Sequence, residues 1–293
     1  MIEFIAEVSS NHARDLSRCL KFVDVSADAG CSAVKFQLFR VRELFAPEAF
    51  LAKPQLLKRE DWQLPVSFLP RIAQHCRDRG VQFSCTPFYL DAVVELEPHV
   101  DFFKIASYEM IWDELLKACA RTGKPVVLST GMATMPEVLH AVDTLQKAGC
   151  HELTLLHCTS AYPTPHHEAN LAAIATLRSA TGCRVGWSDH TVEPAVIHRA
   201  VHRWDARVIE FHLDLDRHGE EFASGHCWLP EQIGAVIRDV GKALVCDGQG
   251  IKAPVPSELS DRDWRADPSD GLRPLKRIRD NLVAPPALHT ATA

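Results

Sequence analysis

Short runs of β-branched and aromatic residues alternate along this chain with longer amphipathic stretches that end in glycine. After the run at residues 2–8, apolar residues recur every three or four positions from Leu16 to Ala27, which lines one face of a helix. Gly30 follows, and helices often end with a glycine in the left-handed conformation. Later stretches end in the same way at Gly80, Gly123, Gly149 and Gly182. The pattern predicts strands that are joined by helices.

The alternation predicts eight strands, and this number indicates a closed barrel. They are expected at residues 2–7, 33–39, 81–85, 101–105, 126–129, 153–158, 184–187 and 207–212. Alternating strands and helices imply parallel strands with right-handed crossovers, and eight such units in about 250 residues suit an α/β chain folded as a (β/α)8 TIM barrel. The alternative is a doubly wound open sheet. That fold usually has a glycine-rich phosphate loop, and no G-x-G-x-x-G or Walker-type sequence occurs here.

The barrel is expected to occupy residues 1–246. Residues 247–293 are rich in proline and charge and show little periodicity, so we expect an irregular tail that packs on the barrel or frays. The net charge of −6 provides no basic face, which argues against nucleic acid or an anionic membrane as a partner.

The sequence also predicts a cytoplasmic protein with free thiols. No apolar run approaches the roughly 20 residues of a membrane span, and Glu3 stands where a signal peptide carries bases. The ten cysteines are scattered singly without a Cys-x-x-Cys pair, which favours buried free thiols over disulfides.

Polar residues collect at the predicted carboxyl ends of the strands, where a barrel carries its active site. They include Glu7, Lys35, Gln37, Thr86, Lys104, Ser107, Glu109, Ser129, Ser160, Tyr162, Ser188, His190, Glu210 and His212. Strands that are buried on both faces should be apolar, yet Lys35 and Lys104 each lie inside one. Because a buried ammonium without a partner is costly, we expect both lysines to face the barrel mouth and meet an anion.

Lys35 and Lys104, with hydroxyls at four other strand ends, suit a small phosphorylated carboxylate. The four hydroxyl residues are Thr86, Ser107, Ser129 and Ser188. The alternative is a purely structural role, in which the two lysines form ion pairs with Glu7 and Glu210. The hydroxyls at the other strand ends favour the anion site.

His190 and His212 end neighbouring predicted strands, so their imidazoles are expected to converge on one cation. Two neutral imidazoles with oxygen ligands suit a divalent transition ion such as manganese or zinc. A lone histidine in a strand is more often a satisfied core residue, but the pair favours a metal site. His198 and His202, four residues apart on the next predicted helix, are expected on the outside of the barrel.

The ordered motifs resemble those of the sialic acid synthase family over roughly residues 2–230. They are Ile5-Ala6-Glu7 with Asn11-His12, Val34-Lys35-Phe36-Gln37, Cys85-Thr86-Pro87-Phe88, Lys104-Ile105-Ala106-Ser107, Ser129-Thr130-Gly131-Met132, Cys158-Thr159-Ser160-Ala161-Tyr162-Pro163-Thr164-Pro165, Ser188-Asp189-His190-Thr191 and Ile209-Glu210-Phe211-His212. Each motif alone is weak evidence for this family, whereas eight motifs in the same order are specific for it.

The resemblance implies a metal-dependent condensation of phosphoenolpyruvate with an aldose, such as N-acetylmannosamine, to a 2-keto-3-deoxy sugar acid and phosphate. The expected donor-binding residues are Lys35, Thr86, Lys104, Ser107, Ser129 and Ser188. His190 and His212 would hold the divalent metal, most often Mn²⁺. Gln37 and Tyr162 would face the sugar, with Ser160 as a further substrate contact, and Glu7 and Glu109 would be the acid and base candidates, beside Lys104. A homodimer is a plausible assembly.

The sequence departs from the family pattern on the acceptor side. The family's usual C-terminal antifreeze-like domain is not expected, and its Gly-Pro-Asp segment after the metal histidine is absent. We expect the same donor with a differently bound acceptor. The missing contact is expected from Asp214, Asp216, Glu221 or His226, or from Arg265 or Arg273 of the tail folding over the mouth.

Two other functions are compatible with these residues. A Schiff-base aldolase would use Lys104 or Lys35 as nucleophile, because burial lowers the pKa of a lysine and frees its amine. A non-catalytic sugar-acid-binding barrel would keep the fold without turnover. The intact set of polar groups on the donor side favours the metal-dependent condensation over both.

Overall fold

The computed structural model describes residues 2–283, and its eight main strands close into a parallel barrel. The strands are β1 (Glu3–Glu7), β2 (Ala33–Leu38), β3 (Gln82–Pro87), β4 (Phe102–Ile105), β5 (Val126–Ser129), β6 (Leu153–Cys158), β7 (Arg184–Asp189) and β8 (Val208–Leu213). Each pairs with the next along the chain, and β1 also pairs with β8 in the register Ile5 with Glu210. The predicted (β/α)8 barrel is therefore confirmed.

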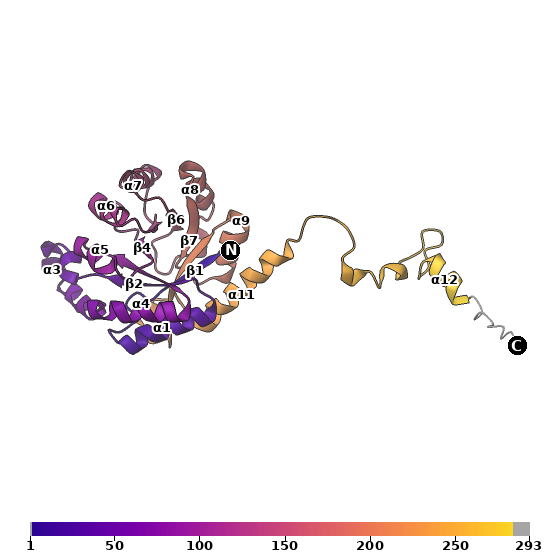
Figure 1. Cartoon of the computed structure of the whole chain (residues 1–293), viewed down its shortest axis with the longest axis horizontal. Helices are drawn as coiled ribbons and strands as arrows, with labels where there is room; N and C mark the ends of the chain where they lie inside the picture. Colours follow the sequence, from indigo (N-terminus) through magenta and orange to yellow (C-terminus); the bar gives the residue numbers. More distant parts are fainter. Residues whose placement is uncertain (1, 284–293) are drawn as a thin grey trace. The chain divides into compact units, whose positions relative to one another are not determined.

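Helices ring the strands, as Figure 1 shows. The longer ones are α1 (Leu16–Ala29), α4 (Leu69–Arg79), α5 (Leu90–Leu96), α6 (Asp113–Arg121), α7 (Met135–Lys147), α8 (Ala173–Thr181), α9 (Pro194–Trp204) and α11 (Pro230–Cys246). Their apolar faces pack on the outward side chains of the strands, where Phe22 and Ile72 are fully buried. This packing is the main hydrophobic core.

The predicted glycine stops are also confirmed. Gly30 has a φ of +94°, and its backbone N–H donates to the carbonyl oxygen of Ala27 at 3.0 Å. A residue with a β-carbon adopts this conformation only with strain, so glycine ends the helix and turns the chain into β2. The other four predicted stops, Gly80, Gly123, Gly149 and Gly182, also have positive φ.

The barrel interior consists of an apolar floor with a polar layer above it. The floor is a separate cluster of Ile5, Ala33, Phe102, Val127, Leu156 and Val208. Side chains alternate along a strand, so the residue two positions further on points to the same side. Those residues are Glu7, Lys35, Lys104, Ser129, Cys158 and Glu210. The strand period therefore places the predicted polar residues inside the barrel, towards its carboxyl ends.

Several short elements were not predicted. The connection from β2 to α4 contains α2 (Val41–Leu44), α3 (Pro47–Ala52), η1 (Pro54–Trp62) and η2 (Val66–Phe68). After β6 comes η3 (His166–Glu168), and after β8 come α10 (Glu220–Ala223) and β9 (Cys227–Trp228). β9 pairs parallel to β8, with Cys227 opposite His212. These connections lack the long periodic patterns from which the main elements were predicted.

Contacts within the described residues divide the chain after Leu244. The second unit contains only short elements, η4 (Pro256–Glu258), η5 (Arg262–Trp264) and α12 (Lys276–Val283). Part of the predicted tail, residues 284–293, lies outside the described residues. A role for Arg265 or Arg273 at the barrel mouth stays a prediction.

Two compositional expectations can be compared with the structure. All ten cysteines are free, and eight of them are buried, whereas Cys183 is half-buried and Cys246 is exposed. Across residues 2–283, no helix combines the length and the apolar character that crossing a membrane requires.

Gly186 in β7 offers a test of the barrel packing. A β-carbon there would overlap the carbonyl oxygen of Val208 on β8, which is backbone and cannot rotate away. We expect Gly186→Ala to lower the free energy of unfolding by about 1–3 kcal/mol in urea denaturation. Gly241 of α11 has open space around it, so Gly241→Ala should instead stabilise the fold by about 0.5–1 kcal/mol. An unchanged stability of Gly186→Ala would contradict the packing of β7 on β8.

Candidate functional site

A cavity of about 720 Å³ lies at the carboxyl ends of the strands. Ten of the thirteen predicted site residues line it: Lys35, Gln37, Lys104, Ser107, Glu109, Ser129, Tyr162, Ser188, His190 and His212. Glu7 and Thr86 are buried behind Lys35 and contact it. Ser160 lines a neighbouring depression instead. The fold thus brings residues from six strands to one cavity.

Lys35 and Lys104 are held by two buried carboxylates. Lys35 Nζ lies 2.5 Å from Glu7 Oε2, 3.8 Å from Glu210 Oε2 and 3.3 Å from Thr86 Oγ1. Lys104 Nζ lies 3.4 Å from Glu210 Oε1. The ion pairs that the sequence offered as an alternative to the anion site are therefore present. Because both lysines also line the cavity, the pairs and an anion site are compatible.

The two lysines differ in how well their charge is compensated. For Lys35, burial favours the neutral amine, but Glu210 and Glu7 outweigh burial and raise its pKa. For Lys104, burial prevails over the attraction of Glu210 and lowers its pKa. An additional anion in the cavity would therefore stabilise the ammonium of Lys104 more than that of Lys35. Glu210 has a lowered pKa because the two lysines outweigh its burial.

Two of the serine hydroxyls have no hydrogen-bond partner. Ser129 Oγ and Ser160 Oγ are buried and unpaired among the described residues, although buried hydroxyls are normally paired. Ser107 Oγ accepts a hydrogen bond from the N–H of Gly131 at 3.0 Å, and a β-carbon at Gly131 would overlap Ser160 Oγ. Ser129 lines the same cavity as Lys104, and an oxyanion there would satisfy its unpaired hydroxyl. Ser188 Oγ, by contrast, already donates to Glu210 Oε1 at 3.1 Å.

Histidines at the carboxyl ends of β7 and β8 also line the cavity. The ring centroids of His190 and His212 lie 5.2 Å apart, as the predicted convergence requires. His190 Nδ1 lies 3.0 Å from the carbonyl oxygen of Thr159, and His212 Nδ1 lies 2.7 Å from Glu221 Oε2. Histidines that bind a metal commonly engage their second nitrogen in this way. The ring of Tyr162 packs on His190 at 4.2 Å.

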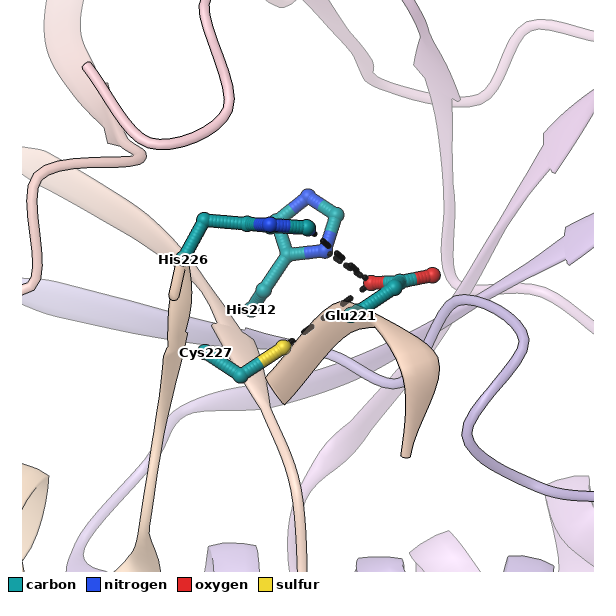
Figure 2. A group of neighbouring side chains, drawn as sticks. All are labelled: His212, Glu221, His226 and Cys227. Atoms are coloured by element: carbon teal, nitrogen blue, oxygen red, sulfur yellow. Dashed lines mark hydrogen bonds and ion pairs between the residues drawn. The ribbon is translucent and has the colours of Figure 1, made fainter. Parts of the chain in front are cut away.

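The loop after β8 divides the four predicted acceptor-side residues into two pairs. Glu221 and His226 line the cavity, and Figure 2 shows both pointing toward His212 together with Cys227. Asp214 and Asp216 are not among the lining residues. They form ion pairs with Arg18 of α1 at 3.2 and 2.6 Å, so their role is to anchor the loop. Cys227 was not predicted as a site residue, although it follows His226 directly.

Aromatic residues from the β2–α4 connection form one wall of the cavity. Phe45 and Trp62 line it, and the guanidinium of Arg59 lies 5.4 and 5.2 Å from their ring centroids. Phe88 and Tyr108 follow β3 and β4 and also line the cavity. Sequence reasoning missed this wall, because the segment has no strand or long helix from which its position could be inferred.

Glu109 is the titratable group best suited to proton transfer near neutral pH. Its burial raises the pKa of the carboxyl to about 7, against the opposing attraction of Lys104. Its Oε2 has no hydrogen-bond partner among the described residues. A carboxyl with a pKa near 7 exchanges a proton with little cost at that pH. This environment fits the predicted acid or base role of Glu109.

Two other features lie away from this cavity. His198 and His202 stack with ring centroids 5.7 Å apart on α9, and His202 is exposed as predicted. A depression of about 510 Å³ at the opposite end of the barrel is lined by Glu3, Gln82 and Arg184 among others, and by none of the predicted site residues.

Comparisons with known proteins place similar sequences and a similar barrel in one family. The family model described as the NeuB family matches residues 22–252. The chain is 34% identical over 270 residues to an N,N'-diacetyllegionaminic acid synthase of Campylobacter jejuni, covering 87% of this chain and 80% of that protein. It is 30% identical to a pseudaminic acid synthase of the same species, covering 84% and 75%. A crystal structure of the N-acetylneuraminic acid synthetase of Leptospira borgpetersenii, in complex with citrate, superposes with a TM-score of 0.79 at 29% identity, covering 89% and 90%.

The environment of Glu109 predicts a specific pH dependence of stability. Its pKa is about 7 in the fold against an ordinary 4.5, so the folded protein holds a proton that the unfolded chain releases. The stabilisation that this proton gives the folded state is fully present below pH 4.5 and is lost as the pH rises through 7. Relative to the wild type, Glu109→Gln should therefore gain unfolding free energy between about pH 5 and about pH 8 in urea denaturation.

The matched control is Glu97→Gln, at an exposed position. It reports the effect of replacing an exposed carboxylate in the same assay. A Glu109→Gln difference that does not change with pH would contradict the raised pKa of the Glu109 carboxyl.

Proposed function

The chain belongs to the NeuB family, and on this premise we propose that it is a sugar-acid synthase that condenses phosphoenolpyruvate with an aldose. The products are a 2-keto-3-deoxy sugar acid and inorganic phosphate. The observation that carries the proposal is the composition of one cavity. It holds the buried ammonium groups of Lys35 and Lys104, called here the lysine end, together with the imidazoles of His190 and His212, called here the histidine end.

The lysine end suits the two anionic groups of phosphoenolpyruvate. Lys104 is 2% exposed, and its charge is only partly compensated by Glu210 at 3.4 Å. The unpaired hydroxyl of Ser129 and the Ser107 hydroxyl lie at the ends of the neighbouring strands. We assign the phosphate and carboxylate to these groups and to Lys35. Thr86 and Ser188 act through Lys35 and Glu210, to which they are hydrogen-bonded.

The histidine end has the donors to hold a divalent ion. The residues present fit such an ion because two imidazoles lie with centroids 5.2 Å apart beside the buried carboxylate of Glu221, and each engages its Nδ1 with an oxygen acceptor. His190 and His212 would hold it, and manganese is the ion that the resemblance implies. When bound, such an ion supplies Lewis-acid polarisation of the acceptor's carbonyl oxygen.

The chain's own residues position the reactants and move protons. The methylene carbon of phosphoenolpyruvate forms a bond to the aldehyde carbon of the open-chain sugar, and water adds to the enol carbon. The tetrahedral species then loses phosphate. Glu109 is placed to transfer a proton in these steps, which is typically worth about 10²–10⁴ in rate. Glu7 lies behind Lys35 and holds its ammonium, which fits a positioning role better than direct proton transfer.

The acceptor sugar would lie between the aromatic wall and the histidine end. Gln37 lines the cavity and donates to Glu7 Oε1 at 2.6 Å, which fixes its amide. Tyr162 covers His190 and is placed to contact the sugar. Arg59 on the aromatic wall offers a cation to an acceptor with a polar substituent. The relatives named above are synthases of different acids, so the acceptor is assigned only as an aldose.

A panel of aldoses tests the proposal directly. The protein, phosphoenolpyruvate and a divalent ion are incubated with each sugar, and phosphate release and product mass are measured. We expect one class of amino sugar to give a product equal in mass to the sugar plus pyruvate. Phosphate release without such a product would contradict the condensation. Borohydride reduction in the presence of pyruvate should leave Lys104 and Lys35 unmodified, whereas a covalent adduct would support the Schiff-base aldolase.

The matched variants are Lys104→Met and Lys117→Met. Removing the Lys104 ammonium should lower kcat/KM by roughly 10²–10³, the usual loss for a preorganised charge at a reacting centre. Lys117 lies on α6 and is 43% exposed, so its variant should retain the wild-type rate.

A further inference from the structure

We propose that the ion in this chain is held by a four-donor centre of His212, Glu221, His226 and Cys227, and that the centre selects zinc, cobalt(II) or iron(II) over manganese. The role of the ion rests on the proposed function, but its binding does not. The proposal keeps His212 of the predicted pair and replaces His190 with three residues from the loop after β8, the segment in which the sequence departs from the family pattern.

The four donors converge from three elements. His212 lies in β8 and Cys227 is its register partner on β9, so their side chains point the same way. Glu221 comes from α10, and His226 directly precedes β9. One donor atom from each residue lies within 4.8 Å of every other. Figure 2 shows His212, His226 and Cys227 around the Glu221 carboxylate, with dashed lines to one of its oxygens.

The distances between the donor atoms are close to those in a tetrahedral site that holds a metal ion. Glu221 Oε2 lies 2.7 Å from His212 Nδ1, 3.5 Å from His226 Nε2 and 3.9 Å from Cys227 Sγ. Bonds of 2.0–2.3 Å in a tetrahedral site place neighbouring donors roughly 3.3–3.8 Å apart. Only small side-chain adjustments are therefore needed. The contact between His212 and Glu221 has the length of a hydrogen bond, and an ion bound to both residues would replace it.

The four-donor centre is largely buried, and its polar atoms lack some of the hydrogen bonds that buried groups normally make. His226 is 5% exposed, and its Nδ1 has no hydrogen-bond partner among the described residues. Cys227 is 3% exposed, and the Glu221 side chain is 17% exposed. A carboxylate, a thiol and two imidazoles in so small a buried volume are costly without a common partner. A cation would satisfy all four at once.

A second layer of polar groups orients the donors. Ser10 Oγ donates to Glu221 Oε1 at 2.9 Å, which leaves Oε2 facing the centre. Asn11 Nδ2 donates to the Leu213 carbonyl oxygen at 2.9 Å and lies 3.6 Å from Cys227 Sγ. Such outer contacts accompany most metal sites and fix the direction of the ligands. Their presence here distinguishes a built centre from a chance cluster.

The donor types decide the choice of ion. Manganese and magnesium favour carboxylate, carbonyl and water oxygens, whereas a thiolate with imidazoles suits zinc and its neighbours. Burial raises the pKa of the Cys227 thiol, but a coordinated ion removes the proton of a ligating thiol outright. The donor set therefore points away from the manganese that the resemblance implies.

His190 is adjacent to this group but outside it. Its ring centroid lies 5.2 Å from that of His212 and 6.5 Å from that of His226, and its Nδ1 lies next to the Thr159 carbonyl oxygen. An ion bound by His190 and His212 alone would not need Glu221, His226 or Cys227. The two arrangements therefore make opposite predictions for the loop variants.

Cobalt(II) titration of the chelator-stripped full chain distinguishes them. We expect one cobalt per chain, with a near-ultraviolet thiolate-to-cobalt band and an intense visible band of a four-coordinate ion. Cys227→Ser should lose the near-ultraviolet band and keep visible absorption. His226→Ala should weaken cobalt binding by more than the roughly 10–100-fold that loss of an outer-shell partner causes. Circular dichroism confirms that each variant is folded, and the near-isosteric serine variant keeps the test valid if the alanine variant is not.

Three variants outside the centre serve as controls. His218→Ala changes an exposed residue of the same loop, Cys246→Ser removes an exposed thiol, and His202→Ala removes the exposed histidine of α9. All three should give the wild-type spectrum. Wild-type binding and spectra in His226→Ala and Cys227→Ser, with loss of binding in His190→Ala, would overturn the four-donor centre and leave the proposed condensation standing. Absence of cobalt and zinc binding in the wild type would overturn the centre, whereas a failed aldose panel would overturn the function alone.

Discussion

The structure depends on two ammonium groups that are buried inside a parallel barrel. Lys35 and Lys104 would be untenable there without Glu7 and Glu210, since removing one partner of a buried pair leaves an uncompensated charge that costs about 3–5 kcal/mol. The pairs require β1, β2, β4 and β8 to keep their register, because a slip of one residue would turn each side chain to the other face. The barrel thus fixes the charges, and the charges leave Lys104 partly uncompensated and facing the cavity.

The alternation of strands and helices was enough to predict most of the fold. The two-residue period of the strands was enough to predict the part of the site that contains Lys35 and Lys104. Apolar runs and glycine stops located every main strand to within about two residues, because those signals are local. Lys35 and Lys104 stood out because an isolated charge in an apolar run is rare. The aromatic wall with Trp62, and the choice between Asp214 and Glu221 on the loop, could not be predicted. They depend on contacts such as that of Arg18, which no local pattern encodes.

Ion pairs and hydrogen bonds attach the loop after β8 to the barrel. Arg18 anchors its first turn through Asp214 and Asp216, and Asp189 at the end of β7 accepts hydrogen bonds from the indoles of both Trp187 and Trp228 at 3.0 and 2.9 Å. The donors on this loop are therefore positioned before any ion arrives, which is what a precise metal site requires. The same contacts place Glu221 and His226, the chain-specific part of the site, at the cavity that the lysines also line.

A crystal structure with phosphoenolpyruvate tests the central claim most directly. The account predicts that the ligand occupies the barrel mouth, with its phosphate or carboxylate oxygens within hydrogen-bond distance of both Lys35 Nζ and Lys104 Nζ and of the Ser129 hydroxyl. Its methylene carbon would face the histidine end of the cavity. Phosphoenolpyruvate bound elsewhere, with both lysines still engaged only by Glu7 and Glu210, would show that these ion pairs are purely structural.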